Sequence, residues 1–157
     1  MQLDDILQPG CVKVPLEATQ KKAAIFELVD LLAEQGLLTE TQTVKEAVWM
    51  RETTRTTGIG HGLAIPHAKT ASCENLIMAV GKPEKPIDFE AIDAKLVNII
   101  ILLVSPQDKT GPHIQALAKI SRMMTQVDFR TKVASADNAE QLYRLIIDAD
   151  AQIPTAG

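Results

Sequence analysis

The 157-residue sequence contains little cysteine, few aromatic residues and no excess of positive charge. Its two cysteines, Cys11 and Cys73, have no second cysteine at motif spacing, so we expect buried thiols instead of a zinc knuckle or a redox pair. The formal net charge of -4 argues against nucleic acid as the main partner, because that binding needs a positive surface.

Long apolar runs are also missing. No run reaches the roughly 18 to 20 residues that span a bilayer, and the N-terminus "MQLDDILQPG" lacks the charged-then-apolar pattern of a secretory signal. We therefore expect a cytoplasmic protein that is not embedded in a membrane.

Aliphatic residues dominate what is present. Hydrophobic residues make up 46% of the chain and charged residues 23%, against 3% aromatic, which is typical of a compact globular protein and not of a disordered chain. The length suits one domain over residues 1–157, with a core that needs neither disulfides nor a structural metal.

Helical periodicity occurs in several places. Within residues 19–36, apolar residues recur at the spacing of a helix that buries one face, and Gly36 suits its C-terminal stop. Thr39 with Gln42 resembles a capping box, which predicts a second helix that runs to about Arg51. The same reasoning predicts two later helices, over residues 112–124 and 138–149.

Two apolar, β-branched runs predict buried strands. They are "NLIMAVGK" at residues 75–82 and "KLVNIIILLVS" at residues 95–105, and we expect the second to be central in its sheet. With the helices between and after them, the predicted class is α/β, one sheet with helices on its faces.

The segment "GIGHGLAIPHAK", residues 58–69, holds two of the chain's three histidines. Its GxGxG spacing differs from a dinucleotide fingerprint, and the chain has no GxxxxGK[ST] motif, so we find no nucleotide cradle. The glycines allow positive φ and close backbone approach. Pro66 should end the strand over residues 62–65 or hold it at a sheet edge, which would leave His67 at an exposed tip suited to chemistry.

The third histidine, His113, permits two interpretations. In the helix that Pro112 opens, it shares a face with Leu117, Ile120 and Met124, which favours a buried core position. It also lies in the first turn, where free N–H groups attract an anion and disfavour imidazolium.

Two blocks of sequence resemble one known family. "MRETTRTTGIGHGLAIPHAK" is similar to an Arg-Glu pair followed by a glycine-rich segment and the [IV]-P-H phosphorylation motif, and "HIQALAKI" to a histidine that opens a helix after the central strand. Both belong to the type-2 EIIA domains (fructose, mannitol and nitrogen-regulatory) of the bacterial phosphoenolpyruvate-dependent phosphotransferase system. The resemblance implies a single mixed β-sheet flanked by helices on both faces.

The resemblance also implies roles for residues. His67 would accept a phosphoryl group from the carrier HPr or its nitrogen-branch counterpart, making the chain a phosphotransferase component. His113 and Arg51 would position the group and approach its charge. Gly60, His61 and Gly62 would support the phosphoryl group and its loop. No cofactor and no metal is required.

Some residues near the motif stay open. Nitrogen-regulatory members usually have "GNG" where this chain has "GHG", so His61 is either a surface bystander or a third imidazole that makes phosphoryl handling pH-dependent. Arg55 and Lys69 are either functional cations or solvated charges. For the carrier we expect an apolar, partly acidic docking face around His67, with Ile59, Leu63 and Ile65 as its apolar candidates.

Alternatives remain at the level of function. A free-standing chain of this size and the "TGIG" style favour a nitrogen-branch regulator, with a regulated transporter or kinase as partner. A fructose- or mannitol-type component that passes phosphate to an EIIB domain is the next candidate. An interaction module without catalysis, and a hydrolase with a metal on His61, His67 and His113, are more remote.

Overall fold

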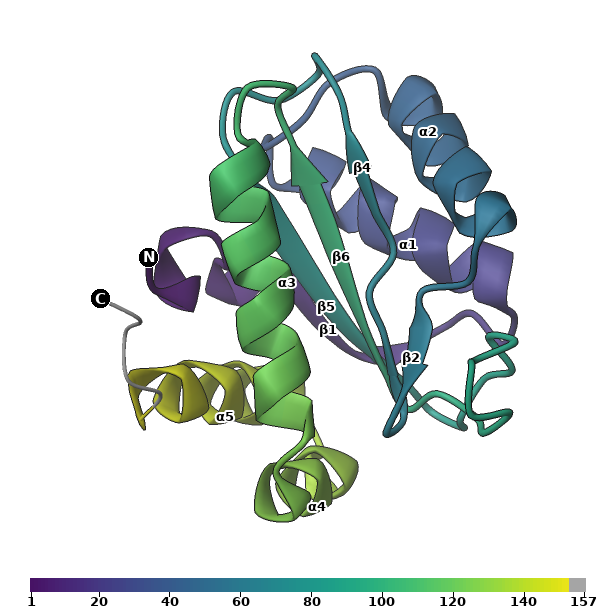
Figure 1. Ribbon diagram of the computed structural model, residues 1–157, viewed down its shortest axis with the longest axis vertical. Helices are drawn as coiled ribbons and strands as arrows, with labels where there is room; N and C mark the ends of the chain where they lie inside the picture. Colours follow the sequence, from purple (N-terminus) through teal and green to yellow (C-terminus); the bar gives the residue numbers. More distant parts are fainter. Residues whose placement is uncertain (153–157) are drawn as a thin grey trace.

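The apolar run near residue 100 forms the centre of one mixed sheet in the computed structural model, which describes residues 1–152 (Figure 1). This strand, β6 (Ile99–Ser105), has every residue buried, and β5 (Ile77–Pro83) pairs with it in antiparallel orientation. The sheet order is β1-β5-β6-β3-β2, and β4 also pairs with β6. The predicted central strand is therefore confirmed. The other strands are β1 (Val12–Leu16), β2 (Gly58–Gly60), β3 (Leu63–Ala64) and β4 (His67–Lys69).

Helices cover both faces of the sheet, as predicted (Figure 1). Helix α1 lies against β5 and β6, α2 against β4, α3 against β6, and α5 against β1. In Figure 1, α3 lies on the near side of the sheet, beside β6 in this view, and α1 lies behind the sheet. The helices are α1 (Lys21–Glu34), α2 (Thr41–Thr54), α3 (Thr110–Met124), α4 (Val127–Ser135) and α5 (Ala139–Gln152), with short 3-10 turns at Leu3–Asp5 and Pro9–Cys11.

Two predicted helix starts are wrong by a few residues. Helix α2 begins at Thr41 after Glu40, whose φ is 50°, so no capping box forms at Thr39. Helix α3 begins at Thr110, two residues before Pro112. His113 remains in the first turn, and its own N–H already donates to the carbonyl of Lys109 at 3.1 Å.

Strands β3 and β4 form one extended run beside β6. Leu63 pairs with Ile99 and His67 with Leu103, in the same parallel direction. Between them, the carbonyl of Pro66 accepts the N–H of Leu103 at 3.0 Å. Pro66 thus interrupts the run without turning it, and His67 begins a second strand instead of ending the first.

Three successive residues with positive φ, the last of β2 and the two of the turn that follows, connect β2 to β3. Gly60, His61 and Gly62 have φ of 103°, 58° and 78°. A Cβ on Gly62 would lie 2.6 Å from the side-chain Oδ1 of Asn98, so this turn needs glycine for space as well as for conformation.

Both cysteines are buried, as predicted, and burial raises the pKa of each thiol. Among residues 1–152, no helix combines the length and apolar composition needed to cross a membrane.

Candidate functional site

His67 lies at the edge where β4 and β6 end and α3 begins. Its side chain is half-buried, and its Nδ1 lies 2.8 Å from the backbone carbonyl oxygen of Ile65. A carbonyl can only accept a hydrogen bond, so Nδ1 must carry the proton. This leaves the lone pair on Nε2, the nitrogen at the other side of the ring.

His113 approaches His67 from α3. The ring centroids are 5.2 Å apart, and the planes meet at 69°. His113 is only 4% exposed, and its Nδ1 lies 2.7 Å from the hydroxyl oxygen of Ser105. The helix face that His113 shares with Ile120 and Met124 is buried, so this residue belongs both to the core and to the site.

Cationic side chains flank the histidine pair. Arg51, in the last turn of α2, donates from Nη1 to the carbonyl of Arg55 at 3.1 Å. Lys69 lies two residues after His67 on β4, and its Nζ donates to the Thr110 hydroxyl at 2.7 Å. A cavity of about 440 Å³ opens between them; its lining residues are Arg51, His67, Ala68, Lys69, Thr110, His113, Ile114 and Leu117. We call this space the His67 cavity.

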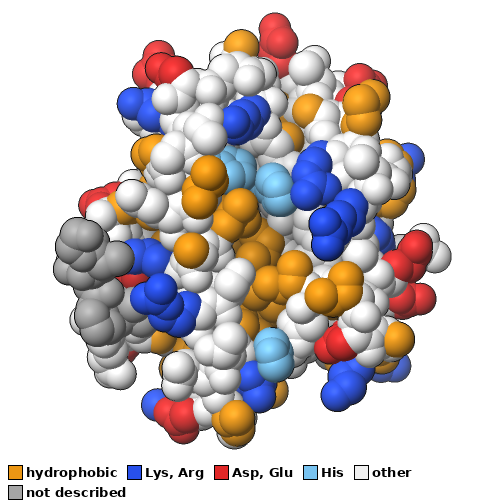
Figure 2. All heavy atoms as spheres, viewed as in Figure 1, with side chains coloured by type: hydrophobic (Ala, Val, Ile, Leu, Met, Phe, Trp, Pro, Cys, Tyr) orange, Lys and Arg blue, Asp and Glu red, His pale blue; other side chains and the backbone are white. Residues whose placement is uncertain are grey.

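A second cavity, of about 260 Å³, adjoins the first and shares Arg51, His67 and Leu117 with it. The rest of its lining combines three isoleucines with four polar residues; they are Ile59, Ile65, Ile92, Arg55, Thr56, Thr57 and Ser121. Figure 2 shows this arrangement on the surface, with a pair of histidines beside lysine and arginine and an apolar stretch next to them.

The expected acidic part of the docking face is absent from this lining. Neither cavity has an aspartate or glutamate in its lining, whereas Arg51, Arg55 and Lys69 contribute positive charge. Ile59, at 37% exposure, lines the surface, whereas Ile65, which also borders the second cavity, and Leu63 are buried in the core. The face is apolar and basic.

Both histidines of the pair favour the neutral state. Burial lowers the pKa of His67, and the charge of Arg51 lowers it further. Burial lowers the pKa of His113 to about 4, and the neighbouring His67 and Lys69 act in the same direction. A neutral imidazole with a free lone pair is a nucleophile near pH 7.

The other predicted site residues lie elsewhere. The carbonyl of Gly62 accepts the N–H of Ile99, whereas His67 pairs with Leu103. Four residues of strand separate these levels, which is about 13 Å at roughly 3.3 Å per residue. Gly60, His61 and Gly62 therefore do not border the His67 cavity, and Figure 2 shows histidine side chains at two separate places on this face.

This separation also removes the geometry for a three-histidine metal site. His61 is not beside the pair, and within residues 1–152 no three His, Cys, Asp or Glu side chains cluster in a way that could hold a metal ion.

Two polar residues near the site were not identified from the sequence as functional. Ser105 is the single polar residue of the buried strand β6, which was the available signal. Glu52, the neighbour of Arg51, is 2% exposed and accepts the Thr57 N–H at 2.5 Å and the Thr57 hydroxyl. This carboxylate fixes the link between α2 and β2 next to Arg51.

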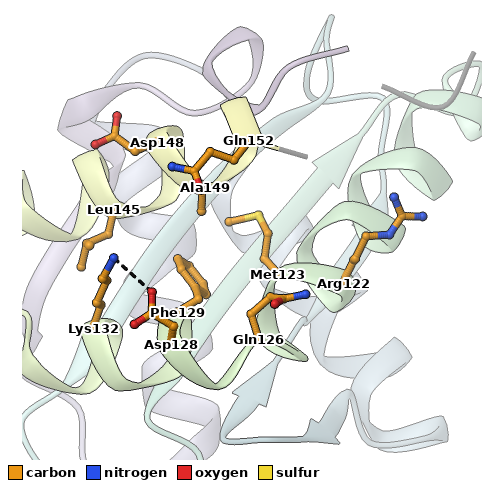
Figure 3. A pocket seen from close by; sticks show the side chains of 10 residues that line it. All are labelled: Arg122, Met123, Gln126, Asp128, Phe129, Lys132, Leu145, Asp148, Ala149 and Gln152. Atoms are coloured by element: carbon orange, nitrogen blue, oxygen red, sulfur yellow. Dashed lines mark ion pairs between the residues drawn. The ribbon is translucent and has the colours of Figure 1, made fainter. Parts of the chain in front are cut away.

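A larger cavity, of about 480 Å³, lies between α3, α4 and α5 (Figure 3). Its lining mixes apolar residues such as Phe129 and Leu145 with exposed charges, including the Lys132–Asp128 ion pair at 3.2 Å. No histidine, cysteine or serine lines it, so it offers no nucleophile comparable to His67.

Fold and site together define an α/β domain with a histidine whose Nε2 lone pair is free at the edge of its sheet, beside a second histidine and cations suited to an anion. The comparisons with known proteins specify the class further. A family model, "Phosphoenolpyruvate-dependent sugar phosphotransferase system, EIIA 2", matches residues 5–149, and the chain belongs to this family.

Individual relatives are of two kinds. A nitrogen regulatory protein of Pseudomonas aeruginosa is 33% identical over 94% of this chain and 96% of its own length. The fructose-specific EIIABC component of Bacillus subtilis is 30% identical over 96% of this chain but only 24% of its own length. The crystal structure of the nitrogen regulatory protein IIA-Ntr from Neisseria meningitidis superposes with a TM-score of 0.85, at 28% identity, over 92% of this chain and 98% of that one.

Proposed function

We propose that the chain is a phosphoryl carrier in which Nε2 of His67 accepts a phosphoryl group from the phosphohistidine of an HPr-like protein. One observation carries the proposal. The Ile65 carbonyl holds the proton on Nδ1, so the lone pair of Nε2 is free beside a cavity lined by cations and a second histidine.

The transfer step follows from these contacts. The Nε2 lone pair forms a bond to phosphorus while the P–N bond of the donor breaks, and the donor histidine keeps the electron pair of that bond. The His67 ring becomes positively charged because Nδ1 retains its proton, and the Ile65 carbonyl stabilises this charge as acceptor of the Nδ1–H bond.

The surroundings supply charge and position. A loose, in-line transition state spreads negative charge over the equatorial oxygens of the transferred group. Arg51 offers positive charge to these oxygens, and the N–H groups of Thr110 and Gly111 at the start of α3 add donors. Burial lowers the pKa of His113, so this residue is neutral and adds no charge to the pocket.

The docking face supports a protein as phosphoryl donor. Exposed or partly exposed apolar side chains border His67 on two sides, with Ile114 and Leu117 from α3 and Ile59 and Ile92 beyond them. We assign the cations at this face to the phosphoryl group, and the apolar residues to contact with the carrier.

Within the family, we assign the chain to the nitrogen branch as a regulator. Support comes from the nitrogen regulatory relatives, which this chain matches over nearly its full length and theirs. The fructose-specific relative motivates the second candidate, an EIIA component that passes phosphate to an EIIB domain.

Reconstituted phosphotransfer separates these candidates. The chain is incubated with phosphoenolpyruvate, Enzyme I and HPr of the sugar branch, or with the corresponding proteins of the nitrogen branch, and the initial rates of labelling are compared. We expect faster labelling by the nitrogen-branch carrier and no onward transfer to a fructose EIIB domain. Preferential labelling by HPr with onward transfer would make the chain a sugar component, and no labelling by either carrier would leave an interaction module.

A further inference from the structure

The hydroxyl of Ser105 is a buried polar group with one partner. Ser105 is the last residue of β6, is 0% exposed, and follows six apolar residues of that strand. Its Oγ lies 2.7 Å from Nδ1 of His113, and no other hydrogen bond of this hydroxyl occurs within residues 1–152. A buried hydroxyl that lost this bond would be left unpaired, which is unfavourable.

The direction of this hydrogen bond determines which nitrogen of His113 carries the proton. If Nδ1 donated to Oγ, the hydroxyl proton of Ser105 would have no acceptor in a buried position. If the hydroxyl donates to Nδ1, every buried donor of the pair is satisfied and the imidazole proton resides on Nε2. The second arrangement is therefore favoured.

Neighbouring residues of the sheet fix the backbone of Ser105. Its carbonyl accepts the N–H of Thr70 at 2.9 Å, and in the sheet it pairs with Lys69 on β4. The strand that positions His67 is therefore the same strand that fixes Ser105. Figure 1 shows how the end of β6 leads through a short loop to the first turn of α3, which carries His113.

The two histidines consequently have opposite tautomers. Ile65 offers an acceptor to Nδ1 of His67, whereas Ser105 offers a donor to Nδ1 of His113. His67 therefore has a bare Nε2, and His113 has an Nε2–H, with ring centroids 5.2 Å apart. An N–H at this place donates to a phosphoryl oxygen, whereas a bare nitrogen would repel it.

We propose that Ser105 is a positioning residue, which holds His113 in the Nε2–H tautomer so that it donates a hydrogen bond to the phosphoryl group on His67. The inference rests on the proposed phosphoryl transfer for its consequence. The tautomer itself is a property of the unphosphorylated protein and can be measured without any phosphoryl donor.

The test combines a spectroscopic and a kinetic measurement. Ring nitrogens of ¹⁵N-histidine-labelled, unphosphorylated protein are assigned by long-range proton–nitrogen correlation in the wild type, Ser105→Ala and Ser105→Thr. We expect Nε2–H at His113 in the wild type, a mixture with Nδ1–H in Ser105→Ala, and the wild-type pattern again in Ser105→Thr. Phosphoryl transfer should slow about 2- to 10-fold in Ser105→Ala, the range that corresponds to one net hydrogen bond.

A control separates positioning from loss of stability. Val80→Ala removes buried volume from β5, where Val80 pairs with Ile101, four residues before Ser105 along β6. It should lower the melting temperature without changing the His113 tautomer or the transfer rate. A wild-type His113 with its proton on Nδ1, an unchanged tautomer in Ser105→Ala, or a changed tautomer at an unchanged rate would each overturn the proposal. A wild type that is never labelled would overturn the proposed function and, with it, the kinetic role, whereas the tautomer result would stand by itself.

Discussion

At the scale of single residues, the hydrogen-bond partner of each imidazole decides its chemistry. His67 and His113 are the same side chain in the same cavity, and burial lowers the pKa of both. The carbonyl of Ile65 leaves the lone pair of His67 on Nε2, and the donation that we propose from the Ser105 hydroxyl would place the proton of His113 on its Nε2. Ser105 is not recognisable from a histidine motif, because it is the last residue of an apolar strand.

Arg51 gives the first residue-scale prediction. It lines both cavities at His67, so Arg51→Gln should slow phosphoryl transfer by roughly 10²-fold, the order of effect seen when one charge-stabilising group is removed from a transition state. Arg144→Gln is the matched control, because Arg144 is exposed and its one ion pair within residues 1–152 is with Glu140 on the surface of α5. The measurement is the initial rate of phosphoryl transfer at equal carrier concentration. An equal loss of rate in both variants would show that Arg51 has no specific role in the transfer.

At the scale of elements, the run formed by β3 and β4 determines which residues meet. Because both strands lie parallel to β6, the five residues from Leu63 to His67 extend along it instead of folding back. The β2–β3 turn therefore lies toward the opposite end of β6 from His67. Its glycines pack against the segment before β6, where Gly62 approaches Asn98.

Two glycines test this account of the turn. Gly62 and Gly36 both have positive φ, but a Cβ on Gly36 would meet nothing within 4 Å, whereas one on Gly62 would lie 2.6 Å from Asn98 Oδ1. Gly36→Ala should lower the free energy of unfolding by about 1–2 kcal/mol, and Gly62→Ala by about 1–3 kcal/mol more because of the added clash. Denaturant unfolding measures both. Phosphoryl transfer in folded Gly62→Ala should equal the wild type, and a large loss there would bring the turn back into the site.

The sequence predicted the elements with strong periodicity. The apolar run of β6 predicts a buried strand, and the spacing of Leu28 and Leu32 predicts a helix that buries one face. The strand and the two leucines are buried in the structure. Strand β1 was not predicted because "VKVPL" is short and contains a proline, and α4 because only Phe129 and Val133 of its nine residues are buried. Distances between motifs could not be predicted from the sequence. His61 and His67 are six positions apart and were expected to lie together, but the strand between them runs along β6 and separates them.

At the scale of the whole molecule, the charge of the site differs in sign from that of the chain. The net charge is -4, yet the cavities at His67 are lined by Arg51, Arg55 and Lys69 without a carboxylate. A local positive field in an acidic protein favours a dianionic group at this one place. The encounter with a carrier that presents a phosphoryl group should therefore weaken as salt is added.

Stability should depend on the protonation of His113. Its pKa falls from 6.5 to about 4 on folding, so the unfolded chain binds more protons between these values and the folded state is disfavoured as pH decreases. We expect the free energy of unfolding to be unaffected by this group above about pH 6.5, and to decrease by about 1–3 kcal/mol between there and pH 4. Denaturant unfolding of wild type and His113→Gln across this range measures the difference, which would instead be independent of pH if the pKa of His113 were the same in the folded and unfolded states.

The central claim is that Nε2 of His67 bears the phosphoryl group. Its most direct test is nitrogen–phosphorus coupling in uniformly ¹⁵N-labelled protein after phosphorylation by phosphoenolpyruvate, Enzyme I and an HPr-like carrier. We expect coupling to Nε2 of His67, with the proton retained on Nδ1, and no labelling of His67→Ala. Coupling at Nδ1 of His67, at His61 or at His113, or a phosphorylated His67→Ala protein, would contradict it.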